Sequence, residues 1–484
     1  MSKFKTITTL TFMALVAFGN FAAFGQSDSL WTVQRCINYA LEHNLSVQNQ
    51  ELLLENNRVN LGQSKLERLP TLNASANYGY NWGRSINPET NLVTLDQQAN
   101  GFGSLNASWL IFNGGNVLNT IRQNKALLSS GENDLEKAKN DVILNIITFY
   151  TNVIFNKELL ANAQLQYKST KSQLERTEKQ VEAGALPKSS ALDLQAQLAS
   201  NELNVINADN TLQVSLLQLK QAMLLPGTST LDVIIPEIEL DSSMLADINA
   251  EIIYETAEST MPEIKSADGQ VEAADIAIAV AKSNYYPSLR LNAGISTNYS
   301  SLIADKGRLG IDSNTPTIIE QIGVVQTTND PVIASVPNYI RSPYSTTDQL
   351  TDNFGQSVSL SLSIPIFNNY RANAAVQRAK ITRDRATVQA QQQRQILRQT
   401  IETASNDALS SAKAYVSSYK RVEAQEESFR ATKQRYENGA ANYTEYQVAE
   451  NNLFQAKSDL LRAKYNFIFK LKILDFYQGK PIEL

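Results

Sequence analysis

The fold is decided by a long stretch whose central part, from Asn140 to Gly184, reads NDVILNIITFYTNVIFNKELLANAQLQYKSTKSQLERTEKQVEAG. Between Gly114 and Val181 the chain has no proline, and its only glycines are Gly115 and Gly131. Every seventh residue is apolar or aromatic: Ile146, Val153, Leu160, Tyr167, Leu174 and Val181. A sustained seven-residue repeat predicts helices that supercoil around neighbouring helices. The stretch has room for about 70 residues, or ~105 Å of helix at 1.5 Å per residue.

A second copy of this stretch follows later in the chain. Adding 255 to each number gives a second apolar or aromatic column: Ile401, Ala408, Tyr415, Val422, Phe429 and Tyr436. Phe112 pairs with Phe367 and Gly184 with Gly439 at the same shift, whereas Pro70 pairs with Pro287 at a shift of 217. The extra length therefore lies between the strands of the second copy. The 484-residue chain is predicted to be one elongated object built twice.

The expected boundaries follow from this repeat and from a targeting signal. Lys3 and Lys5 precede an apolar run and then small residues, which predicts a signal peptide over 1–25. We expect a first repeat over 26–224, an equatorial connector over 225–249, a second repeat over 250–474 and a short tail over 475–484. Within the connector, 231–235 is typical of a short strand.

The helices are predicted from apolar spacing and from stop signals. A glycine and a proline, Gly184 and Pro187, end the first long helix, and Asn438-Gly439 ends the second. The expected helices are 33–68, 114–183, 188–224, 250–284, 370–437 and 442–474.

Four segments alternate with a period of two and predict β-strands: 72–82, 104–112, 289–299 and 357–367. The last reads SVSLSLSIPIF, with serine on one face and an aliphatic residue on the other. The stretches 83–101 and 300–353 are predicted to be loops. Strands of about ten residues with strict alternation are typical of a membrane barrel, although a half-buried soluble sheet uses the same pattern. Long apolar faces with Tyr78, Tyr80, Trp82 and Trp109 favour the membrane.

The number of strands has a consequence for assembly. Four strands cannot close a barrel, and open edges are not tolerated in lipid. Eight strands would leave an interior filled by side chains, whereas twelve strands from three chains would be wide enough to conduct. The sequence therefore predicts a trimer.

Composition excludes several classes of function. With 43 basic and 48 acidic residues, the chain carries a net charge of −5, which is unlike a nucleic-acid-binding protein. Cys36 and His43 are the only residues of their types, so neither a structural zinc site nor an intrachain disulfide can form. Catalytic motifs and phosphate-binding glycine loops are absent, so we expect no enzyme and no cofactor.

The chain resembles TolC-type outer-membrane efflux proteins. The resemblance rests on Leu69-Pro70-Thr71-Leu72, on Leu110-Ile111-Phe112-Asn113-Gly114-Gly115 and on Ile364-Pro365-Ile366-Phe367-Asn368. It implies an α+β membrane protein in the outer membrane of a Gram-negative bacterium. Duplicated helical hairpins would form a periplasmic α-barrel, and a homotrimer would close a 12-stranded β-barrel. It also implies an exit channel for efflux or type I secretion, with a periplasmic adaptor and an inner-membrane pump as partners.

The same resemblance assigns roles to the helix-hairpin tips. Gly184, Ala185 and Leu186 match one adaptor-contacting tip, and Gly439, Ala440 and Ala441 match the other. Tyr436 and Glu445 match residues of the entrance gate, and we expect Glu445 with Asp193 to form an acidic ring that favours cations. The alternatives are a solvated surface for both acids and simple packing for Tyr436.

This sequence departs from the family pattern at three gate positions. Ala441 stands where the gate arginine is expected, Ser190 replaces an aspartate, and Val448 replaces a second acid. The usual arginine–aspartate bonds of the gate cannot form with these residues.

Three questions remain open at the level of the sequence. A periplasmic coiled-coil adaptor also has long helical hairpins, but four membrane-type strands count against it. Within the channel class, small molecules compete with proteins and polysaccharides as cargo, because the pump selects what passes. The 300–353 segment is either a surface epitope or a plug of the lumen.

Overall fold

The computed structural model describes residues 30–480 except 87–90, 92, 96 and 237–248. The expected signal peptide, the middle of the expected connector and residues 481–484 lie outside the described residues. The chain divides into two compact units. The helical unit takes its residues from 1–56, 129–270 and 387–484, and the sheet unit from 57–128 and 271–386.

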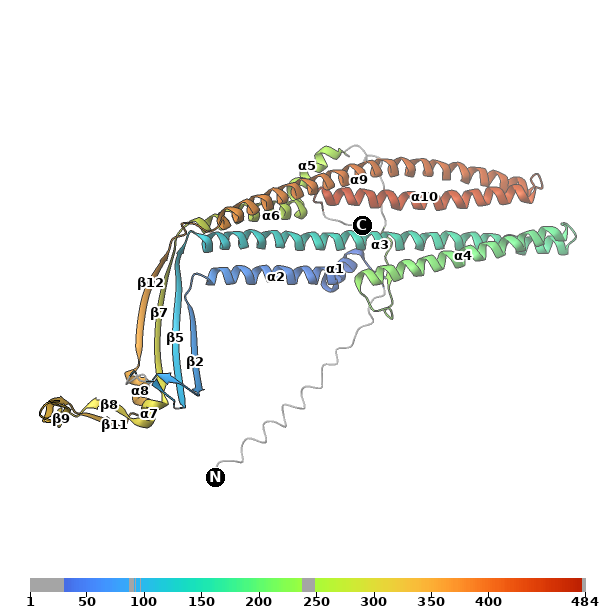
Figure 1. The fold of residues 1–484 in the computed structure, drawn as a ribbon. Helices are drawn as coiled ribbons and strands as arrows, with labels where there is room; N and C mark the ends of the chain where they lie inside the picture. The colour runs from blue at the N-terminus through green and yellow to red at the C-terminus, as the bar shows by residue number, and fades with distance from the viewer. Residues whose placement is uncertain (1–29, 87–90, 92, 96, 237–248, 481–484) are drawn as a thin grey trace, which may run out of the picture. The chain divides into compact units, whose positions relative to one another are not determined.

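Two helices are much longer than all the other described elements (Figure 1). They are α3 (Asn116–Glu182) and α9 (Arg371–Glu437), each of 67 residues. The other main helices are α1 (Val33–His43), α2 (Leu45–Leu66), α4 (Lys188–Met223), α5 (Ala250–Thr260), α6 (Pro262–Lys282) and α10 (Tyr443–Tyr477). All twelve positions of the two seven-residue columns are buried or half-buried, so the predicted packing stripe is confirmed. In the described part of the chain, no helix has the length and apolar character needed to cross a bilayer.

Two predicted helices are each interrupted once. The expected helix 33–68 breaks at Asn44, whose backbone is extended and whose Oδ1 accepts a hydrogen bond from the Ser46 amide at 2.8 Å. The expected helix 250–284 breaks at Met261, because Pro262 cannot supply the amide that a continuous helix needs. Pro262 instead starts α6, where its fixed φ is favourable.

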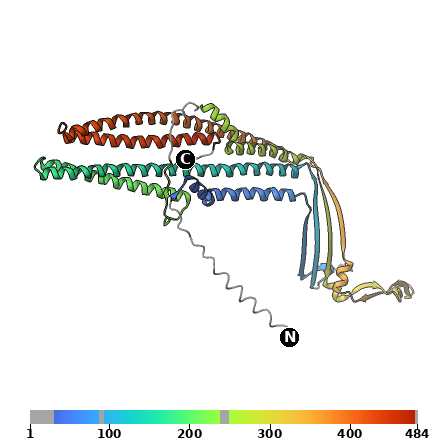
Figure 2. The ribbon, with the colours of Figure 1, turned by 180° about the vertical axis from the view of Figure 1, so that it is seen from behind.

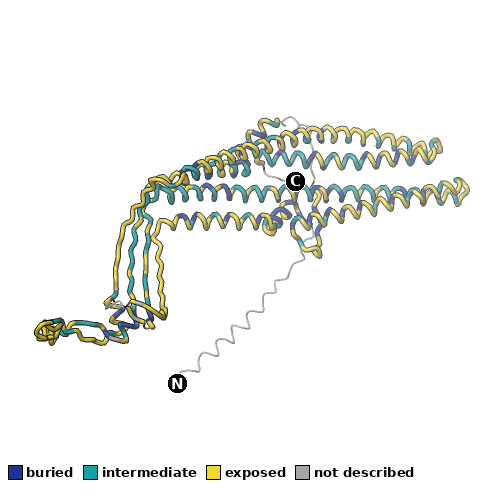
Figure 3. The backbone as a smooth tube through the Cα atoms, in the orientation of Figure 1, coloured by how far each residue is buried: buried dark blue, intermediate teal, exposed yellow. Residues whose placement is uncertain are grey.

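The main core of the helical unit surrounds the middle of α3 (Figure 3). Ile146, Tyr150 and Val153 are almost fully buried there, together with Cys36 of α1. The Tyr150 hydroxyl lies 2.9 Å from the Trp31 carbonyl and 2.8 Å from the Ile234 carbonyl. These carbonyls flank a short parallel pair, β1 (Leu30–Trp31) with β6 (Asp232–Val233), so part of the predicted 231–235 strand is confirmed.

The sheet unit contains four antiparallel strands in the order β12-β7-β5-β2. They are β2 (Thr71–Asn81), β5 (Gln98–Asn113), β7 (Ser288–Ser300) and β12 (Gly355–Ser363). All four expected strands are present. The last one is shorter than the predicted 357–367, because Pro365 has no amide to donate to a neighbouring strand.

The register of the sheet separates apolar from polar residues. Leu72, Ala107, Ala293 and Val358 lie in one row across the four strands. The next row, on the opposite face, is Asn73, Asn106, Gly294 and Ser357. The polar face is cross-linked by hydrogen bonds, among them Ser75 to Ser104 at 2.8 Å and Ser108 to Asn292 at 2.9 Å.

The prediction of an irregular loop over 300–353 is wrong. The segment 301–353, which we call the insert, contains α7 (Ser301–Lys306), β8 (Arg308–Ile311), β9 (Thr317–Val324), β10 (Pro331–Pro337), β11 (Tyr339–Ser342) and α8 (Thr346–Asp352). Its prolines lie at or beside strand ends and do not prevent strand formation. The predicted 83–101 loop also contains a small hairpin, β3 (Ser85–Ile86) with β4 (Val93–Thr94).

Candidate functional site

The two helix-hairpin tips have the same backbone turn. Gly184 and Gly439 have φ values of +75° and +72°. The amide of the residue after each glycine donates to a carbonyl five residues back, Ala185 to Gln180 at 2.8 Å and Ala440 to Arg435 at 2.7 Å. This is the Schellman turn, which requires a left-handed residue and therefore favours glycine. Residues 184, 185, 439 and 440 are all exposed, so both turns can be contacted from outside the chain.

The helices that follow the tips begin differently. Pro187 precedes α4 and offers no side-chain cap. Asn442 precedes α10, and its Oδ1 accepts a hydrogen bond from the Glu445 amide at 2.9 Å. Leu186 and Ala441, the last residues of the two predicted contact triplets, are half-buried.

The predicted gate residue Glu445 is not an isolated charge. Its carboxylate lies 3.3 Å from the guanidinium of Arg435 across the turn, and both side chains are about half exposed. Arg435 also donates to the Ala440 carbonyl at 3.2 Å. Arg435 therefore holds the tip together and partly neutralises Glu445. This arginine is not among the predicted gate residues, and it lies in the last turn of α9.

Asp193 is exposed on α4 and lies near α10. Burial raises the pKa of Tyr443 on α10 to about 12, and the charges of Glu450, Tyr436 and Asp193 act in the same direction. In the described part of the chain, hydrogen bonds and ion pairs do not link Asp193 to Glu445. The structure thus places both acids near the tips without joining them within one chain.

Tyr436 belongs to an aromatic cluster at the end of the α9–α10 hairpin. Its ring centroid lies 5.0 Å from that of Tyr446 and 6.4 Å from that of Tyr443, and Phe429 lies 5.5 Å from Tyr446. Tyr443 in turn packs against the cluster of Leu174, Ala191 and Leu194 on the α3–α4 hairpin. The aromatic cluster therefore packs both within its own hairpin and against the other one.

Below the tips, a row of polar contacts joins α10 to the α3–α4 hairpin. We call this row the polar seam. Its hydrogen-bonded pairs are Ser169–Glu450 at 2.7 Å, Gln166–Asn451 at 3.1 Å, Asn162–Ser458 at 2.9 Å and Gln197–Gln447. A cavity of about 560 Å³ lies along the seam and is lined mainly by asparagine and glutamine from α3, α4 and α10. Polar contacts of this kind can be replaced by water at modest net cost.

Glu450 is the one acidic side chain among the hydrogen-bonded pairs of the polar seam, and it is not among the predicted site residues. It is 4% exposed. Burial raises the pKa of its carboxyl, and hydrogen bonds from Ser169 and Tyr446 and the charge of Lys433 oppose that effect. The sequence did contain a signal for a buried Glu450, because Glu450 lies at helical spacing from Tyr446 and Leu453. In the structure all three residues are buried.

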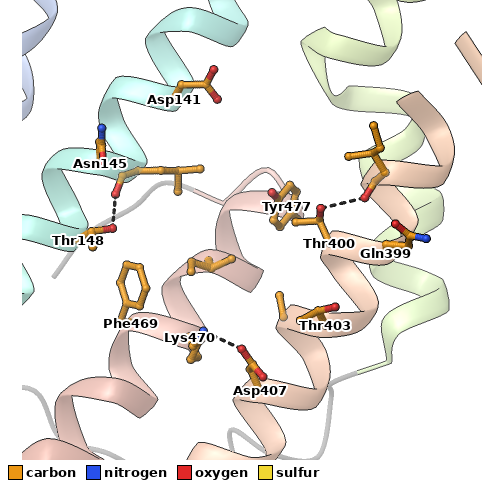
Figure 4. A pocket seen from close by; sticks show the side chains of 14 residues that line it. Asp141, Asn145, Thr148, Gln399, Thr400, Thr403, Asp407, Phe469, Lys470 and Tyr477 are labelled. Carbon is orange, nitrogen blue, oxygen red and sulfur yellow. Dashed lines mark hydrogen bonds and ion pairs between the residues drawn. The ribbon is translucent and has the colours of Figure 1, made fainter. Parts of the chain in front are cut away.

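A second cavity, of about 670 Å³, lies between α3, α9 and α10 (Figure 4). Its three charged side chains already have partners. Lys470 pairs with Asp407 at 2.7 Å, and Asp141 pairs with Lys137. Among the described residues there is also no group of three or more metal-ligating side chains. The cavity is therefore a groove between helices whose charged side chains are already paired.

Comparison with known proteins decides the family. The model of the family described as "Outer membrane efflux protein" matches residues 36–223 and 253–476, which is most of the chain. The chain belongs to the outer membrane efflux protein family. It is therefore an outer-membrane efflux channel, located in the outer membrane and extending into the periplasm, and not an enzyme.

The following relatives of this efflux channel are distant in sequence. It is 26% identical to "Outer membrane protein TolC" of Vibrio cholerae over 201 residues, which are 41% of this chain and 45% of that protein. It is 22% identical to "Probable outer membrane lipoprotein SilC" of Salmonella typhimurium, over 90% of this chain and 82% of that protein. The structure of VceC from Vibrio cholerae is similar with a TM-score of 0.67 at 16% identity, covering 93% of this chain and 97% of the other. At this identity the structural likeness shows the fold alone.

Proposed function

We propose that three copies of the chain assemble into the outer-membrane exit duct of a tripartite efflux or type I secretion system. The four-stranded sheet carries this proposal. Every residue of β2 and β12 is exposed, and neither strand has a partner on its outer side among the described residues. A sheet with an uncovered apolar face and two free edges is incomplete as one chain.

Head-to-tail pairing of identical copies completes the sheet. The β12 edge of one copy can pair with the β2 edge of the next, and the ring closes when the last copy meets the first. Closure removes the free edges that a lipid environment does not tolerate. Twelve strands give an aqueous lumen where eight would not. The serine and asparagine face then lines water, and the face with Leu72, Val358 and Leu360 contacts lipid.

The tips are proposed as the entrance and the contact for a periplasmic adaptor and an inner-membrane pump. The triplets Gly184, Ala185 and Leu186 and Gly439, Ala440 and Ala441 form the contact surface in this proposal. Glu445 and Asp193 form the acidic entrance, and Tyr436 packs the α9–α10 hairpin. The proposal is supported by the exposed turns and by the polar seam, which lets α10 part from the α3–α4 hairpin without exposing a large apolar surface.

A bilayer recording tests the proposal. The purified protein is measured for mass in detergent, reconstituted in a planar lipid bilayer and examined for ionic current. We expect the mass of a trimer and a small, cation-preferring, flickering current. A water-soluble monomer without current would contradict the proposal and favour a periplasmic adaptor instead.

A further inference from the structure

The four-stranded sheet carries a single charged side chain. Charged residues make up 19% of the chain, yet β2, β5, β7 and β12, all within the described residues, contain only one, Arg290. It lies near the start of β7 and is exposed. The four strands run side by side in both views (Figures 1 and 2), so they form one continuous surface. One charge on an otherwise neutral surface sets the sign of the electric field there.

The register places Arg290 on the polar face of the sheet. Arg290 stands opposite Ser361 of β12 on one side and Leu110 of β5 on the other. Because side chains alternate along a strand, Arg290 shares its face with Asn292 and lies opposite to the face of Leu291. The face with Asn292 is the one that lines water in the proposed ring. The guanidinium is therefore directed to the lumen and not to lipid.

The described contacts of Arg290 are with neutral groups. Its Nη1 donates to Ser108 Oγ at 3.2 Å, and Ser108 Oγ in turn donates to Asn292 Oδ1 at 2.9 Å. Among the described residues, Arg290 has no carboxylate partner. A guanidinium has five N–H donors, and arginine binds carboxylate and phosphate oxygens through pairs of them. Arg290 can therefore attract an anion without first giving up an acidic partner.

We infer that three Arg290 side chains, one from each copy, form an anion-attracting ring in the lumen of the barrel. The inference rests on the proposed trimer, because three-fold symmetry places the same residue at the same level in every copy. Rings of arginine or lysine favour anions in pores. The ligands expected are inorganic anions and solutes that carry carboxylate or phosphate groups. The sign of this ring is opposite to that of the acidic entrance proposed at the tips.

The width of the lumen sets the size of the effect. Twelve strands about 4.8 Å apart and tilted by about 40° enclose a Cα circle about 24 Å across. Three charges about 10 Å from the axis enrich a monovalent anion there about twofold at about 0.1 M salt and about fourfold at about 0.01 M. At about 1 M salt the field is almost fully screened. The ring therefore biases which ions pass, and it does so mainly at low ionic strength.

Reversal potentials of the full-length trimer in a planar bilayer test the ring. Arg290→Gln removes the charge and keeps a side chain that can donate to Ser108. Under a KCl gradient of about 0.01 M against about 0.1 M, we expect the permeability ratio of K⁺ to Cl⁻ to rise at least about twofold. Under about 0.1 M against about 1 M, the change should be much smaller, because of screening. Recordings repeated in the Glu445→Ala background remove the proposed tip acid as an influence.

Three further variants separate charge from structure. Arg290→Lys keeps the charge and should keep the wild-type permeability ratio. Asn292→Ala removes the acceptor of the Ser108 hydroxyl without changing any charge, and it should also leave the ratio unchanged. Ser361→Arg, added to Arg290→Gln, returns a positive charge to the same row and face of the sheet. This double variant should restore the wild-type ratio.

The mass in detergent separates failure of the inference from failure of the proposed function. Equal permeability ratios for wild type and Arg290→Gln, in a conducting trimer, would overturn the ring and leave the duct proposal intact. An equally large change in Asn292→Ala would also overturn it, because loss of a sheet contact would then account for the effect. A monomeric mass would remove the trimer and the inference with it.

Discussion

The Ser169 hydroxyl donates a 2.7 Å hydrogen bond to the buried carboxyl group of Glu450, and this bond joins α3 to α10. The groups around the carboxyl come from three helices: Ser169 of α3, Tyr446 of α10 and Lys433 of α9. Burial outweighs their stabilising effect and raises the pKa of Glu450. The packing of α10 against the α3–α4 hairpin is therefore linked to the protonation of Glu450.

The sign of this linkage gives a first prediction. A carboxyl whose pKa is raised by folding stabilises the folded state fully below its unfolded pKa, 4.5, and loses that contribution as the pH rises through the folded value. Glu450→Gln keeps an acceptor for Ser169 and carries no charge. We expect the variant to match the wild type in thermal midpoint near pH 4 and to exceed it at pH 7. Each tenfold change in proton affinity is worth about 1.4 kcal/mol.

Thermal midpoints measured across this pH range check the prediction. Glu437→Gln is the matched control, because Glu437 is an exposed glutamate in the last turn of α9. Parallel pH curves for wild type and Glu450→Gln would show that Glu450 does not provide the linkage.

The Arg435–Glu445 pair gives a second prediction, for ion selectivity. If Glu445 lines the entrance, Glu445→Ala lowers the preference for cations. Arg435→Gln raises it, because it frees the carboxylate from a guanidinium 3.3 Å away. Reversal potentials under a salt gradient measure both effects, with Glu437→Ala as the control. Unchanged conductance and selectivity in both variants would end the idea of an acidic ring.

The two tip glycines give a third prediction. At φ values of +75° and +72°, alanine is strained in both turns, at a cost of about 1–2 kcal/mol at each position. Gly184→Ala and Gly439→Ala should each lower the thermal midpoint. Gly62→Ala is the control, since Gly62 lies inside α2 with no heavy atom within 4 Å of an added Cβ. We expect Gly62→Ala to stabilise the helix by about 0.5–1 kcal/mol. Equal midpoints for all three variants would contradict the assigned turn strain.

Tyr150 gives a fourth prediction, within the core. Its hydroxyl is the donor near two carbonyls, those of Trp31 and Ile234. Tyr150→Phe removes the donor and should cost about 0.5–1.5 kcal/mol, the net contribution of a typical hydrogen bond, because the Trp31 carbonyl keeps the Ile234 amide as a partner. Limited proteolysis near residues 30–31 and 232–233, together with the thermal midpoint, measures the effect. Tyr167→Phe on the same helix is the control. Resistance to proteolysis equal to that of the wild type would show that the bond does not hold β1 against β6.

Sequence reasoning succeeded where a period extended over many residues. The seven-residue columns of α3 and α9 and the alternation of β12 each repeat often enough to specify one structure. It failed where a single residue decides the backbone, as Asn44 and Pro262 do by ending helices within otherwise periodic segments. The insert was missed because its strands are short and bounded by prolines, so that composition alone favoured a loop.

The candidate site could be predicted from the sequence only in part, for a related reason. The tips could be located because glycine marks a left-handed turn. The partners of their side chains could not, since Arg435 meets Glu445 across the turn and Ser169 meets Glu450 from a helix nearly 300 residues earlier in the chain. Such pairs depend on how helices pack, and a single sequence does not record it.

The equal length of α3 and α9 constrains how this gene can change over evolutionary time. Inserting one residue into either helix rotates everything beyond it by about 100°, which exchanges its buried stripe for an exposed one. Insertions of seven residues nearly preserve the stripe. Length variants among descendants of this protein should therefore differ by whole heptads, gained or lost in both 67-residue helices together.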